Sequence, residues 1–342
     1  MSFAYGVDLG LVTQLESLGI TWADDHGARI DPFQAAKDKG ANAVRLRVFV
    51  NPPKEAVWTK QDGTTCYLGF CDTESVAKTA QRVRDVGLRL MIDFHYSDHY
   101  ADPQYQDTPD VWKKDTAEQL EVHVHEHTKS VLSALKECDV SPEWVQVGNE
   151  INMGMLFPLG SFKEYPDNLA CFMNAGYDAV KEVFPECKVI THLTVVQKPQ
   201  YVEPFLDAFF GCGGKTDVLG FSHYPYWFNL IGESRGDPPV ERTAEYLLKY
   251  LVRYHEKYHK PVMICEVGEH EAEEDLSYRL VDQTVKAVKS VPNGQGLGVF
   301  YWEPAVNSAV IPDGYPLGAA RVFAPNQLQF TKALNAYRDN QF

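Results

Sequence analysis

Residues 144–150 read WVQVGNE, a short apolar run that ends in an amide and a carboxylate. Residues 117–135 before this run and residues 168–183 after it place apolar side chains at helical spacing. Strands buried in a parallel sheet are short and mostly apolar, and amphipathic helices connect them. The stretch therefore predicts a β-strand that lies between two helices in a parallel sheet.

The same alternation continues from one end of the chain to the other, with further helical patterns at 73–86, 242–258 and 276–291. Eight rounds of strand and helix predict an α/β fold, a (β/α)8 TIM barrel, which usually needs about 250 residues. No linker or low-complexity tract divides the 342 residues, so we expect residues 1–342 to form a single catalytic domain without an accessory module. The strand candidates are Tyr5–Leu9, Ala43–Phe49, Arg89–His95, Trp144–Glu150, Lys188–Leu193, Val218–Tyr224, Val262–Glu266 and Gly298–Trp302.

The charge balance limits the possible partners. The chain carries 47 acidic and 32 basic residues, a formal net charge of −15, which repels nucleic acid, anionic lipid and acidic polysaccharides. No segment is apolar enough to span a membrane, and the opening MSFAYGVDLG leaves no room for a signal peptide. We expect a monomer, soluble and without an export signal as written, that acts on a neutral substrate and binds neither nucleic acid nor membrane.

Seven cysteines in a chain of this length do not suggest a disulfide framework. Cys66 and Cys71, in CYLGFC, are close enough in sequence to close one loop, and the sequence leaves open whether they are bridged.

Polar residues gather at the C-terminal ends of the predicted strands, which form the catalytic face of such a barrel. Because a buried carboxylate needs partners or a proton, Glu150 and Glu266 on the fourth and seventh strands require an explanation. They are either two satisfied surface acids or a catalytic pair. The irregular stretches 52–71, 98–115 and 153–166 follow strand ends and should lie over the same face. The strand-end residues are Asp93, His95, Asn149, Glu150, His223, Tyr224, Glu266, Trp302 and Glu303.

As a catalytic pair, the two glutamates would cleave a glycosidic bond, one as nucleophile and the other as acid and base. Retention of configuration requires a separation of about 5–5.5 Å. Asn149 would hydrogen-bond to the sugar 2-hydroxyl. Arg45 or Arg47, together with Tyr224, would keep Glu266 ionised through charge-assisted hydrogen bonds. This arrangement separates the pKa values of the two glutamates.

Three other motifs favour no cofactor and no metal. In HVHEH, His123 and His127 lie one helical turn apart but lack the zinc-protease pattern. In GCGGKT, the first glycine of a phosphate-binding loop is replaced by Phe209, so the segment is interpreted as a turn. Cys265, directly before Glu266, could suggest a thiol nucleophile. However, it should point away from the cleft if Glu266 points into it, because side chains alternate along a strand.

Seven longer motifs occur in a characteristic order between residues 5 and 305. They are GVDLGLVTQLESLGI, NAVRLRVFVNP, DFHYSDHYADP, VQVGNEINMGMLFPLG, GFSHYPYW, KPVMICE and GLGVFYWEPA. Together they resemble glycoside hydrolase family 53, the endo-β-1,4-galactanases of clan A. The resemblance implies a (β/α)8 barrel that hydrolyses β-1,4-galactan and type I arabinogalactan side chains of pectin with net retention.

The resemblance also implies roles for individual residues, with Glu150 as the acid/base and Glu266 as the nucleophile. It implies secretion as well, so the native compartment stays open. The positions that the clan keeps around the reactive sugar fall on Arg45, His95, Asn149, Tyr224 and Trp302, and the further candidate substrate-binding residues are Asp93, His223, Tyr226 and Trp227.

The chain departs from the family pattern at several positions. Members tend to carry Trp where this chain has Phe49, Tyr100 and Phe157, and VGEHE follows Glu266 where an aromatic-containing segment is usual. Aromatic faces bind sugars by apolar contact, so subsite number and product length are in doubt. Tyr226, Trp227 and Trp302 remain as candidate platforms, although barrel packing explains Trp227 equally well.

Some bacterial relatives hold a calcium ion in an extended loop after the seventh strand. Here residues 267–275 are a short segment whose acids lack an EF-hand spacing, so we expect no required metal. Two alternatives to a galactanase are open. One is a retaining clan A hydrolase of another neutral β-linked glycan, such as a mannan or a differently linked arabinogalactan. The other is a non-catalytic carbohydrate-binding barrel, which the two intact glutamates disfavour.

Overall fold

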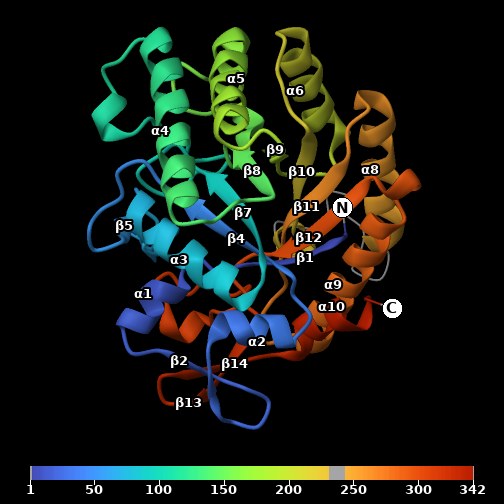
Figure 1. Cartoon of the computed structure of the whole chain (residues 1–342). Coiled ribbons are helices and arrows are strands. Elements are labelled where there is room, and N and C mark those ends of the chain that lie inside the picture. Colours follow the sequence, from blue (N-terminus) through green and yellow to red (C-terminus); the bar gives the residue numbers. More distant parts are fainter. Residues whose placement is uncertain (1, 231–242, 342) are drawn as a thin grey trace.

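The computed structural model describes residues 2–230 and 243–341, and eight parallel strands in it close into a barrel (Figure 1). The strands follow the order β1-β12-β11-β10-β9-β8-β7-β4 around the barrel. Every predicted strand corresponds to one of them, which confirms the (β/α)8 prediction. Their bounds are β1 Ala4–Asp8, β4 Ala43–Val48, β7 Arg89–Phe94, β8 Trp144–Val147, β9 Lys188–Leu193, β10 Val218–His223, β11 Val262–Val267 and β12 Gly296–Tyr301.

Helices cover the outside of the barrel (Figure 1). The prediction for residues 73–86 matches α3 (Thr73–Val86), which begins where Asp72 accepts hydrogen bonds from the amides of Glu74 and Ser75. The helix predicted from residue 242 is α8, described from Thr243, and residue 242 itself lies outside the described residues. The other helices are α1 Val12–Ser17, α2 Pro32–Asp38, α4 Ala117–Glu137, α5 Pro166–Val183, α6 Pro199–Gly211, α7 Pro225–Leu230, α8 Thr243–Tyr258, α9 Glu274–Lys289 and α10 Asn335–Asp339.

An apolar layer fills the barrel interior. The ring of Phe300 occupies the space above Gly6, where an added Cβ would lie 2.1 Å from a ring carbon. Only glycine therefore allows these two strands to pack so closely around the phenylalanine. The layer has members from every barrel strand: Ala4, Ala43, Met91, Trp144, Ile190, Val218, Met263, Cys265 and Phe300.

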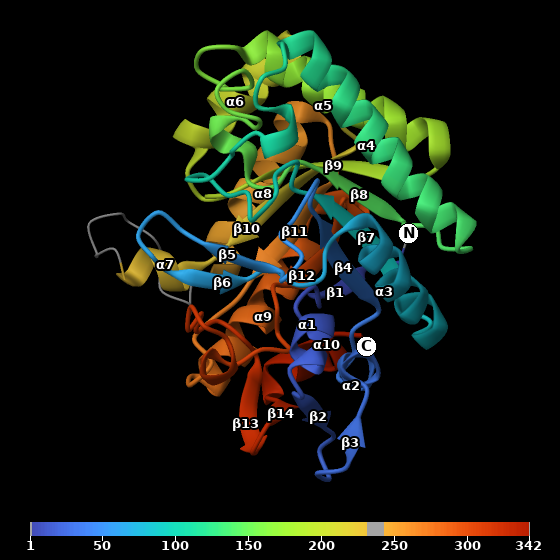
Figure 2. The same cartoon turned by 90° about the vertical axis from the view of Figure 1, so that its left-hand side faces the viewer.

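Two smaller sheets lie outside the barrel. The strands β13 (Ala320–Ala324), β14 (Gln327–Phe330), β2 (Thr21–Ala23) and β3 (Arg29–Ile30) form a sheet below the barrel in both views (Figures 1 and 2). The stretch 52–71, expected to be irregular, contains a hairpin of β5 (Val57–Thr59) and β6 (Thr65–Tyr67). Each strand has only three residues, too few for a periodic pattern to be visible in the sequence.

All seven cysteines are free thiols in the structure, including Cys66 and Cys71. GCGGKT forms the turn that joins α6 to β10, as expected. The Nε2 atom of His123, in HVHEH, lies 2.9 Å from a carboxylate oxygen of Asp115. Within residues 2–230 and 243–341, no helix has the length and apolar character needed to cross a membrane.

Candidate active site

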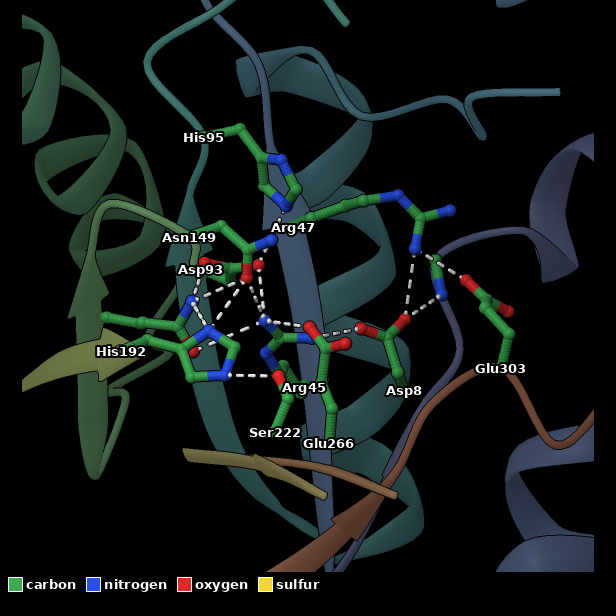
Figure 3. A network of polar contacts seen from close by, with 12 residues as sticks. Asp8, Arg45, Arg47, Asp93, His95, Asn149, His192, Ser222, Glu266 and Glu303 are labelled. Carbon is green, nitrogen blue, oxygen red and sulfur yellow. Dashed lines mark hydrogen bonds and ion pairs between the residues drawn. The ribbon is translucent and has the colours of Figure 1, made fainter. Parts of the chain in front are cut away.

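Above the apolar layer, inward-facing side chains form a buried polar network around Arg45 on β4 (Figure 3). One terminal nitrogen, Nη2, lies 2.7 Å from Asp93, 2.8 Å from the Asn149 side-chain oxygen and 3.0 Å from Glu266. The other, Nη1, lies 3.1 Å from Asp8. Burial opposes the charge of Arg45, yet these three carboxylates raise its pKa well above the usual value. Arg45 is therefore a permanent cation that joins four strands.

Glu266, near the C-terminal end of β11, has a partner for each carboxylate oxygen. Arg45 contacts Oε1 at 3.0 Å, and the Tyr224 hydroxyl donates to Oε2 at 2.9 Å. Burial raises the pKa of Glu266 to about 7, against the lowering effects of Arg45 and the Tyr224 hydrogen bond. Of the two arginines that the sequence proposed for this role, Arg45 is the one that contacts Glu266.

Glu150 follows β8 and adopts a left-handed conformation, with φ of 49° and ψ of 46°. A non-glycine residue in this region stores roughly 1–3 kcal/mol of strain, a feature that clusters at functional sites. Its Oε1 atom lies 2.5 Å from the Ser222 hydroxyl. Burial and the charge of Glu266 raise the pKa of Glu150 to about 8. Since the arginine contacts Glu266 and not Glu150, Glu150 keeps its proton to higher pH than Glu266.

A chain of neutral side chains connects Glu150 to the arginine. His192 Nε2 lies 2.9 Å from the Ser222 hydroxyl oxygen, and His192 Nδ1 lies 2.9 Å from the Asn149 side-chain oxygen (Figure 3). Burial and the charge of Arg45 lower the pKa of His192 well below its usual value, so its ring is neutral.

His95 is oriented on the opposite side of Arg45. Its Nε2 lies 2.9 Å from Asp93, and its Nδ1 accepts a hydrogen bond from the Ala101 amide at 2.8 Å. The Asn149 amide donates to the Ala101 carbonyl at 2.8 Å. The loop that follows β7 therefore fixes both side chains.

A second network lies next to the first and shares Asp8 with it. Arg47 Nη1 contacts Asp8 at 3.1 Å and Glu303 at 2.6 Å. Arg47 Nη2 also contacts the Tyr100 hydroxyl at 3.1 Å, and that hydroxyl donates to the Tyr67 carbonyl. Tyr100 therefore uses its hydroxyl to hold the β5–β6 hairpin to the barrel.

Three predicted platforms lie near one aromatic residue that the sequence analysis missed. The ring centroid of Tyr315 lies 4.7 Å from that of Trp302 and 6.2 Å from that of Trp227. Tyr226 packs against Trp227 at 5.0 Å. Burial and the charge of Glu266 raise the pKa of Tyr315 well above its usual value.

His223 does not join the network. It follows Ser222, which faces Glu150, so its side chain lies on the other face of β10. Its ring is buried, and neither nitrogen has a hydrogen-bond partner among residues 2–230 and 243–341. Its predicted role in substrate binding has no support from this geometry.

The prediction for Cys265 was wrong. Phe221 pairs with Ile264 and Ser222 with Glu266, so Cys265 is the extra residue of a β-bulge. The bulge breaks strict alternation, and Cys265 lies in the interior apolar layer directly before Glu266. Burial raises the pKa of its thiol well above the usual value, so the thiol is unreactive.

The sequence analysis did not single out four more members of the networks: Asp8, Gln146, His192 and Ser222. Each interrupts an apolar strand at an inward position, and that pattern was available in the sequence. The described residues contain no cluster of three or more potential metal-binding side chains of the His, Cys, Asp and Glu types.

The amino-acid sequence of this chain is similar to those of known glycoside hydrolases. The model of the family described as glycosyl hydrolase family 53 matches residues 4–280 and 267–337. An arabinogalactan endo-beta-1,4-galactanase of Cellvibrio japonicus is 30% identical over 330 residues, which cover 89% of this chain and 80% of that protein.

Two solved structures show the same fold. A GH53 catalytic domain of Ignisphaera aggregans aligns with a TM-score of 0.79 and 26% identity over 98% of this chain and 96% of that one. A structure from a study of two fungal beta-1,4-galactanases aligns with a TM-score of 0.81 and 22% identity over 98% of this chain and 99% of that one, a likeness of fold alone. From the family match and the relatives together, the chain belongs to glycosyl hydrolase family 53 and is a glycoside hydrolase.

Proposed function

We propose that this protein is an endo-β-1,4-galactanase that acts by double displacement, with Glu266 as the nucleophile and Glu150 as the acid/base. The observation that carries the proposal is the unequal environment of the two glutamates. Glu266 accepts from a permanent cation and a phenol, and Glu150 contacts a neutral hydroxyl. One carboxyl is thus stabilised as an anion and the other as an acid.

In the first step, a Glu266 oxygen attacks the anomeric carbon while Glu150 gives its proton to the departing glycosidic oxygen. The bond from the anomeric carbon to that oxygen breaks, and a glycosyl ester on Glu266 forms. In the second step, Glu150 takes a proton from water, the water oxygen attacks the anomeric carbon, and Glu266 leaves as a carboxylate. Configuration at the anomeric carbon is retained because it is inverted twice.

Two observations support a galactan substrate. The relative from Cellvibrio japonicus is named an arabinogalactan endo-beta-1,4-galactanase, and it aligns over 89% of this chain. The net charge of −15 suits a neutral glycan, because a chain of that charge repels the anionic backbone of pectin. We further propose the β-1,4-galactan and type I arabinogalactan side chains of pectin as its substrates.

One observation favours a second candidate, a retaining hydrolase of another neutral β-linked glycan. The Tyr100 side chain is anchored by Arg47 and the Tyr67 carbonyl, and its ring centroid lies 6.2 Å from that of Trp302. A phenol fixed in this way offers a smaller apolar face than the indole of a tryptophan. In this second candidate, the site next to Trp302 prefers a sugar other than galactose.

The test is the release of reducing ends from linear β-1,4-galactan, mannan, xylan and cellulose, with the products sized and their first-formed anomer assigned by NMR. Short galacto-oligosaccharides with the β configuration, from galactan alone, are the expected result. Turnover of another glycan without turnover of galactan would select the second candidate. An α product would exclude double displacement.

A further inference from the structure

The acid/base Glu150 must alternate between a protonated and an ionised form, and Ser222 is positioned to hydrogen-bond to both. A serine hydroxyl can accept from a carboxylic acid or donate to a carboxylate. The Ser222 oxygen lies 2.5 Å from Glu150 Oε1 and 2.9 Å from His192 Nε2. The single hydroxyl hydrogen can point to only one of these two atoms at a time. Whether the hydroxyl donates to Glu150 Oε1 or to His192 Nε2 depends on whether His192 Nε2 itself carries a hydrogen.

The surroundings of the other ring nitrogen, Nδ1, decide this question. The Asn149 side-chain oxygen lies 2.9 Å from Nδ1. The orientation of that amide is fixed, because its nitrogen donates to the Ala101 carbonyl at 2.8 Å and its oxygen accepts from Arg45 at 2.8 Å. An oxygen at this distance from Nδ1 requires a hydrogen between the two atoms, since two acceptors would repel each other.

The remaining neighbour of Nδ1 is the Gln146 amide nitrogen, at 3.0 Å. This amide also contacts the Asp93 carboxylate, and it reaches the Gly148 carbonyl at 3.2 Å and the Asn149 oxygen at 3.0 Å. It therefore has acceptors for its hydrogens without using His192. A hydrogen on Nδ1 satisfies the contact with the Asn149 oxygen and leaves the Gln146 amide to its other acceptors, whereas a bare Nδ1 leaves the Asn149 oxygen facing a lone pair.

With its hydrogen on Nδ1, the neutral ring presents a bare Nε2 to Ser222. The Ser222 hydroxyl then donates to His192, and its oxygen accepts the carboxyl hydrogen of Glu150. We propose that His192 and Ser222 are positioning residues that hold the proton on Glu150 between turnovers, and that the Ser222 hydroxyl turns to Glu150 when that proton has left. This inference deepens the proposed function, because it concerns the proposed acid/base.

The step balances without any other reactant. Glu150 loses its proton to the glycosidic oxygen, and the Ser222 O–H bond rotates from Nε2 to the new carboxylate. His192 keeps its hydrogen on Nδ1 throughout, so no proton passes along the chain. When Glu150 takes a proton from water in the second step, the hydroxyl rotates back. The ionised state costs His192 its hydrogen bond, and this cost favours the protonated acid.

Other charged groups also act on Glu150, and none of them is altered in the tests below. Glu266 and Asp102 disfavour its ionised form, and Arg45 favours it. The groups that face His192 are Arg45, Asp93 and His95. Since His192 is neutral, replacing it changes no charge in the network, so a shift in the titration of Glu150 reports hydrogen bonding.

The first test needs no turnover and therefore also decides the inference if galactan is not the substrate. Nitrogen-15 NMR of the whole protein, labelled at histidine, assigns which ring nitrogen of His192 carries hydrogen, and His192→Phe identifies the signal by its loss. We expect the Nδ1–H form from pH 5 to 8. The Nε2–H form would overturn the proposal.

The second test uses the alkaline limb of kcat/KM, where Glu150 loses its proton. His192→Phe frees Ser222 to donate to the carboxylate, so we expect this limb to move to lower pH by up to about 1 unit. In a Ser222→Ala background the same substitution should have no effect on the limb. Equal shifts in both backgrounds, or a shift to higher pH, would contradict the proposal that His192 acts on Glu150 through Ser222. His127→Phe, which replaces a largely buried histidine on the outer helix α4, is the matched control and should leave the limb in place.

Discussion

The hydrogen bond from Tyr224 to Glu266 gives a sharp quantitative prediction. Tyr224→Phe removes one O–H donor at 2.9 Å from Oε2 and leaves the contact of Arg45 with Oε1 in place. A hydrogen bond to a charged group contributes about 1.5–3 kcal/mol, and one pKa unit corresponds to roughly 1.4 kcal/mol. Because Glu266 is only 6% exposed, solvent does little to replace the lost donor. The pKa of Glu266 should therefore rise by roughly 1–2 units.

The sign of the effect follows from the role of Glu266 as an anion. Losing a donor to the ionised form disfavours that form, so the acid limb of kcat/KM should move to higher pH. The assay is reducing-end release from galactan across pH in wild type and variant. Tyr254→Phe is the control, since Tyr254 lies buried on helix α8 and donates to the Val196 carbonyl in the turn after β9, so the acid limb should stay in place. An acid limb that stays in place or moves to lower pH would refute the reasoning, even if kcat falls.

Three further predictions concern the pH optimum, the catalytic pair and the barrel core. Glu266 must be ionised, which occurs above its pKa of about 7, and Glu150 must be protonated, which occurs below its pKa of about 8. The pH profile of kcat/KM should therefore be bell-shaped, with its maximum between these two values. A maximum near pH 5 would contradict this assignment. Glu150→Gln should lower kcat by about 10²–10⁴-fold on galactan, and Glu266→Gln by at least as much, with circular dichroism confirming that both fold; full activity in either variant would remove that glutamate from the mechanism. Gly6→Ala should destabilise the fold by about 1–3 kcal/mol in urea unfolding, because the new Cβ would lie 2.1 Å from the Phe300 ring. Gly211→Ala, where a Cβ meets nothing within 4 Å, should be neutral or stabilising.

The barrel was predictable from the sequence because each barrel strand is a short apolar run and each long helix has a clear apolar face. The prediction for residues 73–86 matches α3 at both ends, since Asp72 caps its start and Gly87, with φ of 79°, ends it. The hairpin of β5 and β6 was not predictable in the same way. Its strands are three residues long and partly exposed, so no period is visible.

The site was predictable in its chemistry but not in its register. Strand-end position singled out Glu150, Glu266 and Asn149, whereas Arg45, inside β4, was proposed as a partner that keeps Glu266 ionised. It did not indicate on which face of β10 the His223 side chain lies, so the role of His223 in substrate binding stays a prediction. Alternation failed for Cys265 for a different reason, because the β-bulge that brings Glu266 opposite Ser222 has no signature in the apolar pattern of β11.

The polar network above the apolar layer explains why one glutamate can keep its proton. The carboxyl groups of Asp8, Asp93, Glu266 and Glu303 share two guanidinium groups, and Glu150 lies beside them, so keeping all five as anions would leave a large uncompensated charge. Protons must therefore stay on the carboxyls with the poorest access to a cation. Glu303 shares Arg47 Nη1 with Asp8, and burial raises its pKa well above the usual value. Glu150 contacts neither arginine directly. Contact with Arg45 thus favours the anionic form of Glu266, and the shortage of nearby cations favours the protonated form of Glu150, as the proposed roles of the two glutamates require.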